Sequence, residues 1–117
     1  MYTIDRERIM ALNRGDTMRI PMFINAGNKL KMVRYILSYD DKVCLSICEP
    51  DQPLERGILR KVFTKDDLNS NGDVMVNISS RETEVLVPGL YYMEIKILLT
   101  NGNTATILPR SKFYINE

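Results

Sequence analysis

Apolar and polar residues alternate with a period of two over several segments of this chain, and this alternation constrains the fold more than any other sequence feature. The segments 17–25 (TMRIPMFIN), 74–78 (VMVNI) and 91–99 (YYMEIKILL) show it most clearly. Successive side chains of a β-strand point to opposite faces, so the pattern predicts strands with one buried face. The residues predicted to face inward are Met18, Ile20, Met22, Ile24, Val74, Val76, Ile78, Tyr91, Met93, Ile95, Ile97 and Leu99.

Further strands are predicted at 32–39, 42–48, 58–63, 104–108 and 112–115, with only a single helical turn at 66–68. In the first two of these we expect Val33, Tyr35, Leu37, Tyr39, Val43, Leu45 and Ile47 to face inward. Turn-forming pairs separate the strands, and Asn101-Gly102 predicts a hairpin with a type I′ turn. We expect the irregular segment 49–57 to cross between two sheets. Short strands at such regular spacing predict an all-β fold, an antiparallel sandwich or barrel.

Composition and charge limit the class of protein. The 117 residues are 44% hydrophobic, which predicts one globular domain over residues 1–117. Sixteen basic residues against 15 acidic ones show no basic excess, so binding to nucleic acid is disfavoured. No apolar run is long enough to span a membrane, and the first ten residues lack the apolar stretch of a secretion signal. We therefore expect no membrane partner and synthesis in a cytoplasm, with Cys44 and Cys48 as free thiols.

Catalytic and metal-binding chemistry has little support in the sequence. The chain has no His, which excludes His-dependent triads, and the pairs Asp40-Asp41 and Asp66-Asp67 are expected to be solvated acids in turns. Residues 67–78 match the first half of a calcium loop, but Ile78 stands where a bidentate Glu is needed. A hairpin loop at Asp67–Gly72 is the better interpretation. We expect a protein that is not an enzyme and has no cofactor or metal.

Two turn segments predict structure more than function. The tripeptide Arg14-Gly15-Asp16 matches an integrin-binding signal, yet Gly15 permits positive φ and Thr17 can begin a strand, so a structural turn is favoured. The segment around Pro88, Gly89 and Tyr91 resembles the tyrosine corner of immunoglobulin-like sandwiches. In that motif the ring packs on the core and the hydroxyl bonds to nearby backbone.

Three apolar side chains fall on the faces opposite the main apolar sets of their strands: Phe23, Tyr92 and Leu98. Loops that partly cover both faces of the central strands would account for them. A protein–protein contact surface is the functional interpretation, because Tyr, Met and Phe are enriched at such surfaces.

The order of the motifs along the chain resembles the N-terminal immunoglobulin-like domain of phage baseplate upper proteins, from phages and prophages of Gram-positive bacteria. The positions that match are Arg14, Gly15, Asp16, Thr17, Asp41, Lys42, Val43, Lys61, Pro88, Gly89, Tyr91, Thr106, Ile107, Leu108, Pro109, Phe113 and Ile115. The family commonly has aspartate where this chain has Glu82, and tyrosine-aspartate where it has Met93-Glu94.

The resemblance implies an immunoglobulin-like antiparallel β-sandwich in a virion tail or baseplate. Its role would be structural, docking onto other tail proteins or onto copies of itself. A carbohydrate- or cell-surface-binding module of the same fold is the alternative. Such modules usually need a stacking aromatic platform, often Trp, and the chain has no Trp.

Overall fold

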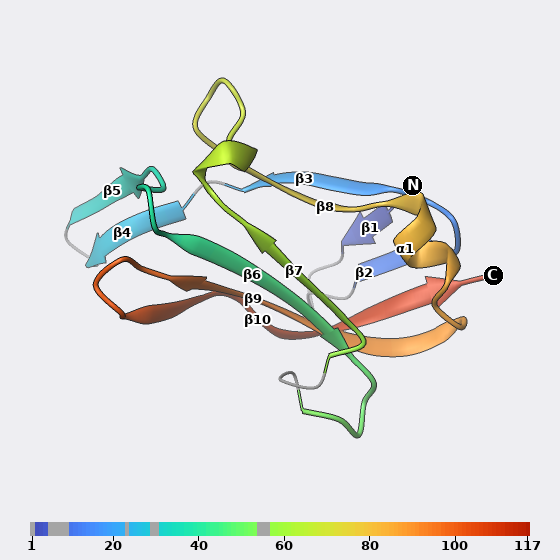
Figure 1. Ribbon diagram of the computed structural model, residues 1–117. Coiled ribbons are helices and arrows are strands. Elements are labelled where there is room, and N and C mark those ends of the chain that lie inside the picture. Colours follow the sequence, from blue (N-terminus) through green and yellow to red (C-terminus); the bar gives the residue numbers. More distant parts are fainter. Residues whose placement is uncertain (1, 5–9, 23, 29–30, 54–56) are drawn as a thin grey trace.

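The computed structural model describes residues 2–4, 10–22, 24–28, 31–53 and 57–117, and most of its regular structure is β-strand (Figure 1). The all-β prediction is confirmed, with one short α-helix added. The strands are β1 (Tyr2–Ile4), β2 (Met10–Asn13), β3 (Met18–Met22), β4 (Ile24–Asn28), β5 (Lys31–Tyr35), β6 (Lys42–Cys48), β7 (Leu59–Phe63), β8 (Val74–Ile78), β9 (Gly89–Leu98) and β10 (Thr104–Asn116). The helix α1 spans Ser80–Glu84, and a 3₁₀ turn, η2, spans Lys65–Asp67.

The strands form one large sheet and two small ones. The large sheet has the order β1-β2-β10-β9-β6-β7, and β3 pairs with β8 while β4 pairs with β5. The large sheet is mixed, because β2 runs parallel to β10 whereas its other pairs are antiparallel. It curls like half a barrel, and the β3–β8 pair lies opposite it (Figure 1). The expected purely antiparallel arrangement is therefore wrong at the β2–β10 pair.

The core lies between the large sheet and the β3–β8 pair. Within β6, Val43, Leu45 and Ile47 are fully buried, as their alternation predicts. The other strand residues of this core cluster are Leu12, Met18, Phe63, Val74, Val76, Ile78, Tyr91, Met93, Ile95, Ile97, Phe113 and Ile115. The inward alternation predicted for β8 and for most of β9 is thus confirmed, with Leu99 only partly buried.

The helix α1 is absent from the sequence prediction, although the sequence contains its signal. Ser79 and Glu82 form a capping box, in which the Ser79 side chain accepts from the Glu82 N–H and the Glu82 side chain accepts from the Ser79 N–H. A Ser followed three residues later by Glu is typical of a helix start. The pattern was masked by the strand alternation immediately before it.

Three other segments differ from expectation. Segment 32–39 ends its pairing at Tyr35, and Tyr39 is 80% exposed instead of buried. Segment 49–57 does not cross between sheets, because β6 and β7 pair directly in the large sheet. In the β9–β10 hairpin, the Gly102 N–H donates to the Leu99 carbonyl, and Gly102 follows at φ 89°. This is a turn centred on Thr100-Asn101 with a glycine bulge, not a two-residue type I′ turn.

Candidate functional site

The face of the large sheet that turns away from β3 and β8 is the candidate site, here called the outer sheet face. Cross-strand register arranges its residues in rows, with Cys44 opposite both Val62 and Lys96, and Ser46 opposite both Arg60 and Glu94. The outer sheet face comprises Lys42, Cys44, Ser46 and Cys48 from β6, Ile58, Arg60 and Val62 at β7, Leu90, Tyr92, Glu94, Lys96 and Leu98 from β9, and Thr104, Thr106, Arg110, Lys112 and Tyr114 from β10.

The predicted contact residues are placed in three different ways. Tyr92 and Leu98 both lie on the outer sheet face, and Leu98 is 39% exposed. Six positions along β9 separate them, which is about 20 Å at the rise of a strand. The structure therefore brings these two residues to one face but not to one spot. Phe23 lies outside the described residues.

Tyr92 is partly covered by Arg110. The guanidinium carbon of Arg110 lies 4.5 Å from the centroid of the Tyr92 ring, which is the geometry of a cation–π contact. Arg110 also donates a hydrogen bond of 3.2 Å to the carbonyl oxygen of Pro50. One face of the Tyr92 ring is thus occupied by a neighbouring side chain, and Arg110 ties β10 to the loop after β6.

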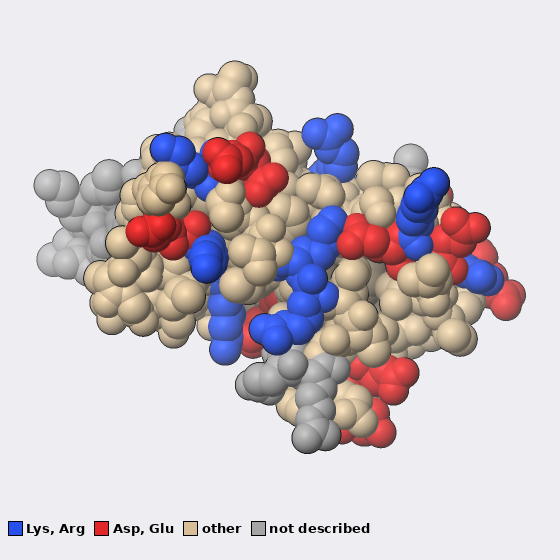
Figure 2. Space-filling model, viewed as in Figure 1, with Lys and Arg blue, Asp and Glu red and all other residues tan. Residues whose placement is uncertain are grey.

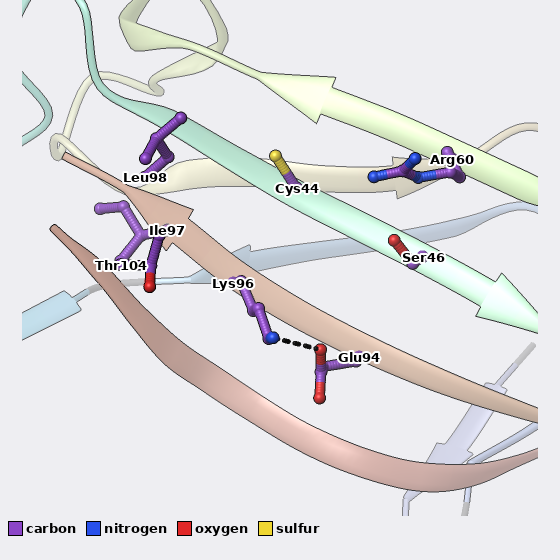
Figure 3. Close-up of a pocket in the computed structure, with 8 residues that line it drawn as sticks. All are labelled: Cys44, Ser46, Arg60, Glu94, Lys96, Ile97, Leu98 and Thr104. Atoms are coloured by element: carbon purple, nitrogen blue, oxygen red, sulfur yellow. Dashed lines mark ion pairs between the residues drawn. The ribbon is translucent and has the colours of Figure 1, made fainter. Parts of the chain in front are cut away.

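A shallow groove of about 230 Å³ crosses the outer sheet face and is lined by Cys44, Ser46, Arg60, Glu94, Lys96, Ile97, Leu98 and Thr104 (Figure 3). Glu94 and Lys96 form an ion pair of 3.3 Å on its floor. Beside them, Val62 lies directly opposite Cys44. The partner of Cys44 on β9 is Lys96, and Leu98 lies two residues further on, so that Val62, Cys44 and Leu98 make a short apolar strip that runs diagonally over three strands.

The apolar residues Ile58 and Val62 were missed in the sequence. They are 47% and 56% exposed, respectively, and both lie at the outer sheet face. Their segment contains apolar residues at most positions, so periodicity does not say which of them point outward. The β6–β7 register decides this, because it pairs Val62 with the outward-facing Cys44.

The charge on the outer sheet face is strongly basic. Among the described residues, it carries Lys42, Arg60, Lys96, Arg110 and Lys112 against one acid, Glu94, although the charge of the whole chain is nearly balanced. In the view of Figure 2, Lys and Arg side chains gather over the middle of the molecule, and Asp and Glu lie mainly around them. The near balance of charge along the sequence does not reveal this concentration, because strand pairing collects residues that are scattered in sequence.

On the inner side of β7, Lys61 makes hydrogen bonds that connect the large sheet to β8 and α1. Lys61 Nζ donates to the carbonyl oxygen of Asn77 at 2.8 Å and to Glu82 Oε1 at 2.8 Å. Burial raises the pKa of Glu82, but the hydrogen bonds from Lys61 and Ser79 outweigh it and hold the pKa below its usual range. Lys61 thus joins the edge of the large sheet to β8 and α1.

The Arg14–Thr17 segment is a turn held by α1. Gly15 has φ 88°, and the Asp16 N–H donates to the Asn13 carbonyl at 3.0 Å. The buried Thr83 hydroxyl accepts from the Gly15 N–H at 3.1 Å and donates to the Asp16 carbonyl at 2.8 Å. Arg14 Nε donates to the Glu84 carbonyl. These contacts pin the tripeptide to the body of the protein, and β3 begins at Met18, one residue after Thr17.

Tyr91 has the geometry of a tyrosine corner. Its ring is buried, and its hydroxyl donates a 2.5 Å hydrogen bond to the carbonyl oxygen of Val87. Gly89, at φ 151°, begins β9 immediately after Pro88. Burial raises the pKa of Tyr91, with a smaller contribution from the charge of Glu49.

Asp41 is buried, whereas the sequence predicted a solvated acid. One of its oxygens accepts from the Tyr35 hydroxyl, from the Ser38 N–H at 2.8 Å and from the Ser38 hydroxyl at 2.9 Å. The other accepts from the Thr100 N–H at 2.8 Å and hydroxyl at 3.0 Å. Burial raises the pKa of Asp41, but the hydrogen bonds from Tyr35, from Ser38 and from the Thr100 N–H outweigh it and hold the pKa well below its usual range. Asp41 therefore ties the β5–β6 connection to the β9–β10 hairpin.

The Asp67–Gly72 loop is built by local hydrogen bonds. The Asn69 side-chain oxygen accepts from the N–H groups of Asn71 and Asp73 at 2.9 and 3.0 Å, which is the Asx-turn geometry expected for a hairpin loop.

Among the described residues, no group of three or more His, Cys, Asp or Glu side chains could hold a metal ion. Within the same ranges, no helix is long and apolar enough to cross a membrane.

Comparison with known proteins finds no matching family model, no matching curated protein and no matching solved structure.

Proposed function

We propose that this chain is an immunoglobulin-like β-sandwich domain that serves as a non-enzymatic structural component of a phage or prophage tail or baseplate. It docks onto another tail protein through the outer sheet face. The location is the virion, after synthesis in the bacterial cytoplasm. The ordered motif set shared with baseplate upper proteins supports the tail assignment.

The strand order supports the immunoglobulin-like part of the proposal. In chain order, β3, β6, β7, β8, β9 and β10 correspond to strands B, C, C′, E, F and G of a variable-type domain. The order β10-β9-β6-β7 then matches the G-F-C-C′ sheet, and β3–β8 matches the B–E pair opposite. Tyr91 near the start of β9 occupies the position of the tyrosine corner on strand F.

The observation that carries the docking proposal is the apolar strip on the outer sheet face. Val62 and Leu98 remain exposed on either side of Cys44, with Val62 on the edge strand β7 and Leu98 at the last position of β9. A protein interface typically places such apolar residues at its centre and charged residues at its rim. Here Lys42 and Lys96 lie directly beside the strip, opposite Leu98 and Cys44, and Arg60 lies in the next row.

Localisation in purified particles tests the tail assignment. Particles would be prepared from the host that encodes the chain, and antibodies to the purified domain would be used for immunogold electron microscopy. We expect labelling at the tail or its tip. Particles that contain none of the chain by mass spectrometry would refute the tail assignment.

Alanine variants test the docking face. With the tail proteins as binding partners, Leu98→Ala and Tyr92→Ala should weaken binding, because each truncates a side chain on the outer sheet face. Val85→Ala is the matched control, since Val85 is also an exposed apolar residue but follows α1. Binding that survives both outer-face substitutions would refute this surface as the docking site.

A glycan-array screen separates the proposal from the carbohydrate-binding alternative. Reproducible binding of one sugar class would favour the binding module. The proposed scaffold should bind none.

A further inference from the structure

We infer that the partner of the outer sheet face is a protein surface that carries carboxylates around an apolar ridge. This inference rests on the proposed docking role, but not on the partner's being a tail protein. It concerns the chemistry of the partner, which neither the motif resemblance nor the fold specifies.

The distribution of charge indicates an acidic partner. Within the part of the chain that the structure describes, five basic side chains lie on the outer sheet face, where one acidic side chain accompanies them. That acid, Glu94, has a side chain only 16% exposed and is already paired with Lys96. The field at this face is therefore positive although the net charge of the chain is only +1. A positive face attracts an acidic surface and speeds its association.

The apolar strip indicates a protein and not a simple polyanion. Val62 and Leu98 lie between the basic residues, and a phosphate backbone would leave these aliphatic side chains without an apolar partner. Single-stranded nucleic acids gain much of their binding energy by stacking bases on aromatic rings. Of the two tyrosines on this face, Tyr92 already has one side of its ring covered by Arg110. The other, Tyr114, lies on β10 opposite Leu90, far from the apolar strip. A partner surface with an apolar ridge flanked by Asp and Glu would bury the apolar strip and would pair its carboxylates with the basic residues.

A second copy of the chain is a poor face-to-face partner. A twofold dimer through this face would place Lys42, Lys96 and their neighbours against the same basic residues of the other copy. Like charges brought together in this way oppose association. The occupant is thus a different protein of opposite charge.

Selection from a displayed library tests the inference without knowledge of the natural partner. The probe is a small folded scaffold with one randomised surface, selected against the immobilised chain at about 50 mM salt, where surface charges are weakly screened. We expect most binders to carry Asp and Glu around Leu, Ile or Phe. Raising the salt to about 300 mM should weaken them at least tenfold, because it shortens the Debye length.

Two double variants locate the binding surface. Lys42→Glu with Lys96→Glu reverses two charges on the outer sheet face and should weaken most binders at least tenfold. Arg19→Glu with Arg81→Glu changes the net charge by the same amount on β3 and α1, and should leave binding within about twofold. Leu98→Ala, which keeps every charge, should weaken the same binders about tenfold. Thermal unfolding of each variant verifies that it is folded.

Four outcomes would overturn the inference. Binders without acidic enrichment, or binders that the two double variants weaken equally, would contradict the charge argument. Duplex DNA or heparin that binds as tightly as the selected scaffolds would indicate a polyanion instead. A dimer in sedimentation velocity that the Lys42→Glu/Lys96→Glu variant dissociates would indicate self-association. Failure of the tail assignment, by contrast, would appear only in the particle experiment.

Discussion

Replacing Asp41 tests the reasoning about buried polar groups most directly. Asp41 is fully buried and accepts five hydrogen bonds, two of them from the backbone N–H groups of Ser38 and Thr100. In Asp41→Ala the three hydroxyl donors can rotate toward other acceptors, but the two backbone donors cannot. Each buried donor left without an acceptor costs about 1–3 kcal/mol. We therefore expect Asp41→Ala to lower the free energy of unfolding by about 3–5 kcal/mol.

Asp41→Asn separates charge from shape. The amide keeps one acceptor oxygen, but its NH₂ group then faces the donors of either Ser38 or Thr100. We expect a loss of about 2–3 kcal/mol for this substitution. The matched control is Asp40→Asn, one residue earlier in the same turn, where the carboxylate is exposed. That control should change stability by less than about 0.5 kcal/mol.

The effect of pH follows from the lowered pKa of Asp41. In the unfolded chain an Asp has a pKa of about 3.9. The folded protein lowers the pKa of Asp41, so that its carboxylate stays ionised to lower pH. The stabilisation is therefore fully present above the unfolded pKa and is lost as the pH falls toward the folded one. Below the unfolded pKa the parent should lose about 1.4 kcal/mol per pH unit from this group, and Asp41→Asn should lose none.

Urea unfolding of the parent, Asp41→Asn and Asp40→Asn between pH 2 and 7 measures these differences. The gap between the parent and Asp41→Asn should be constant from about pH 5.5 to 7 and should shrink toward pH 2. The reasoning is refuted if Asp41→Asn is as stable as Asp40→Asn at pH 7, or if the gap does not change with pH.

Three further predictions concern the turns that join the two sides of the fold, and urea unfolding measures each. Gly15→Val should cost about 1–2 kcal/mol from backbone strain alone, because a β-branched residue is forced to positive φ while no atom lies within 4 Å of the new Cβ. Thr83→Val should cost about 2–3 kcal/mol, because the N–H of Gly15 and the carbonyl of Asp16 lose the hydroxyl that they share. Tyr91→Phe should cost about 1 kcal/mol, since only the bond to the Val87 carbonyl is lost while the ring stays packed.

A control for the loss of a hydroxyl lies at an exposed position. Thr106→Val removes a hydroxyl from the exposed outer side of β10 and should be nearly neutral. Gly15→Val as stable as the parent would disprove the turn argument, and Thr83→Val as stable as Thr106→Val would disprove the role of the shared hydroxyl. For Tyr91→Phe, a loss above about 3 kcal/mol would mean that the ring has shifted as well.

The parts of the candidate site that could be predicted are those with a local signal. Tyr92 and Leu98 were placed opposite the buried face of β9, and the register confirms that they share the outer face. The sequence does not predict which face of the sheet Val62 occupies, because its neighbour Phe63 is also apolar and the apolar–polar alternation is interrupted there. The helix α1 has a local signal in Ser79 and Glu82, so a capping box in the sequence is enough to predict where it begins.

The sequence by itself determined the strands with clear alternation, such as β8 and β9, and which of their faces is buried, because alternation depends only on the geometry of residues two apart. It also determined where the chain turns, since Gly15 and Gly102 permit positive φ whatever surrounds them. Only the tertiary structure decided which strands are neighbours. Strand pairing brings Thr100 next to Asp41. An aspartate that the sequence predicts to be solvated in a turn is therefore buried and connects two loops. The same pairing collected Lys42, Lys96 and Lys112 from distant segments onto one face, because register between strands depends on contacts far apart in the chain.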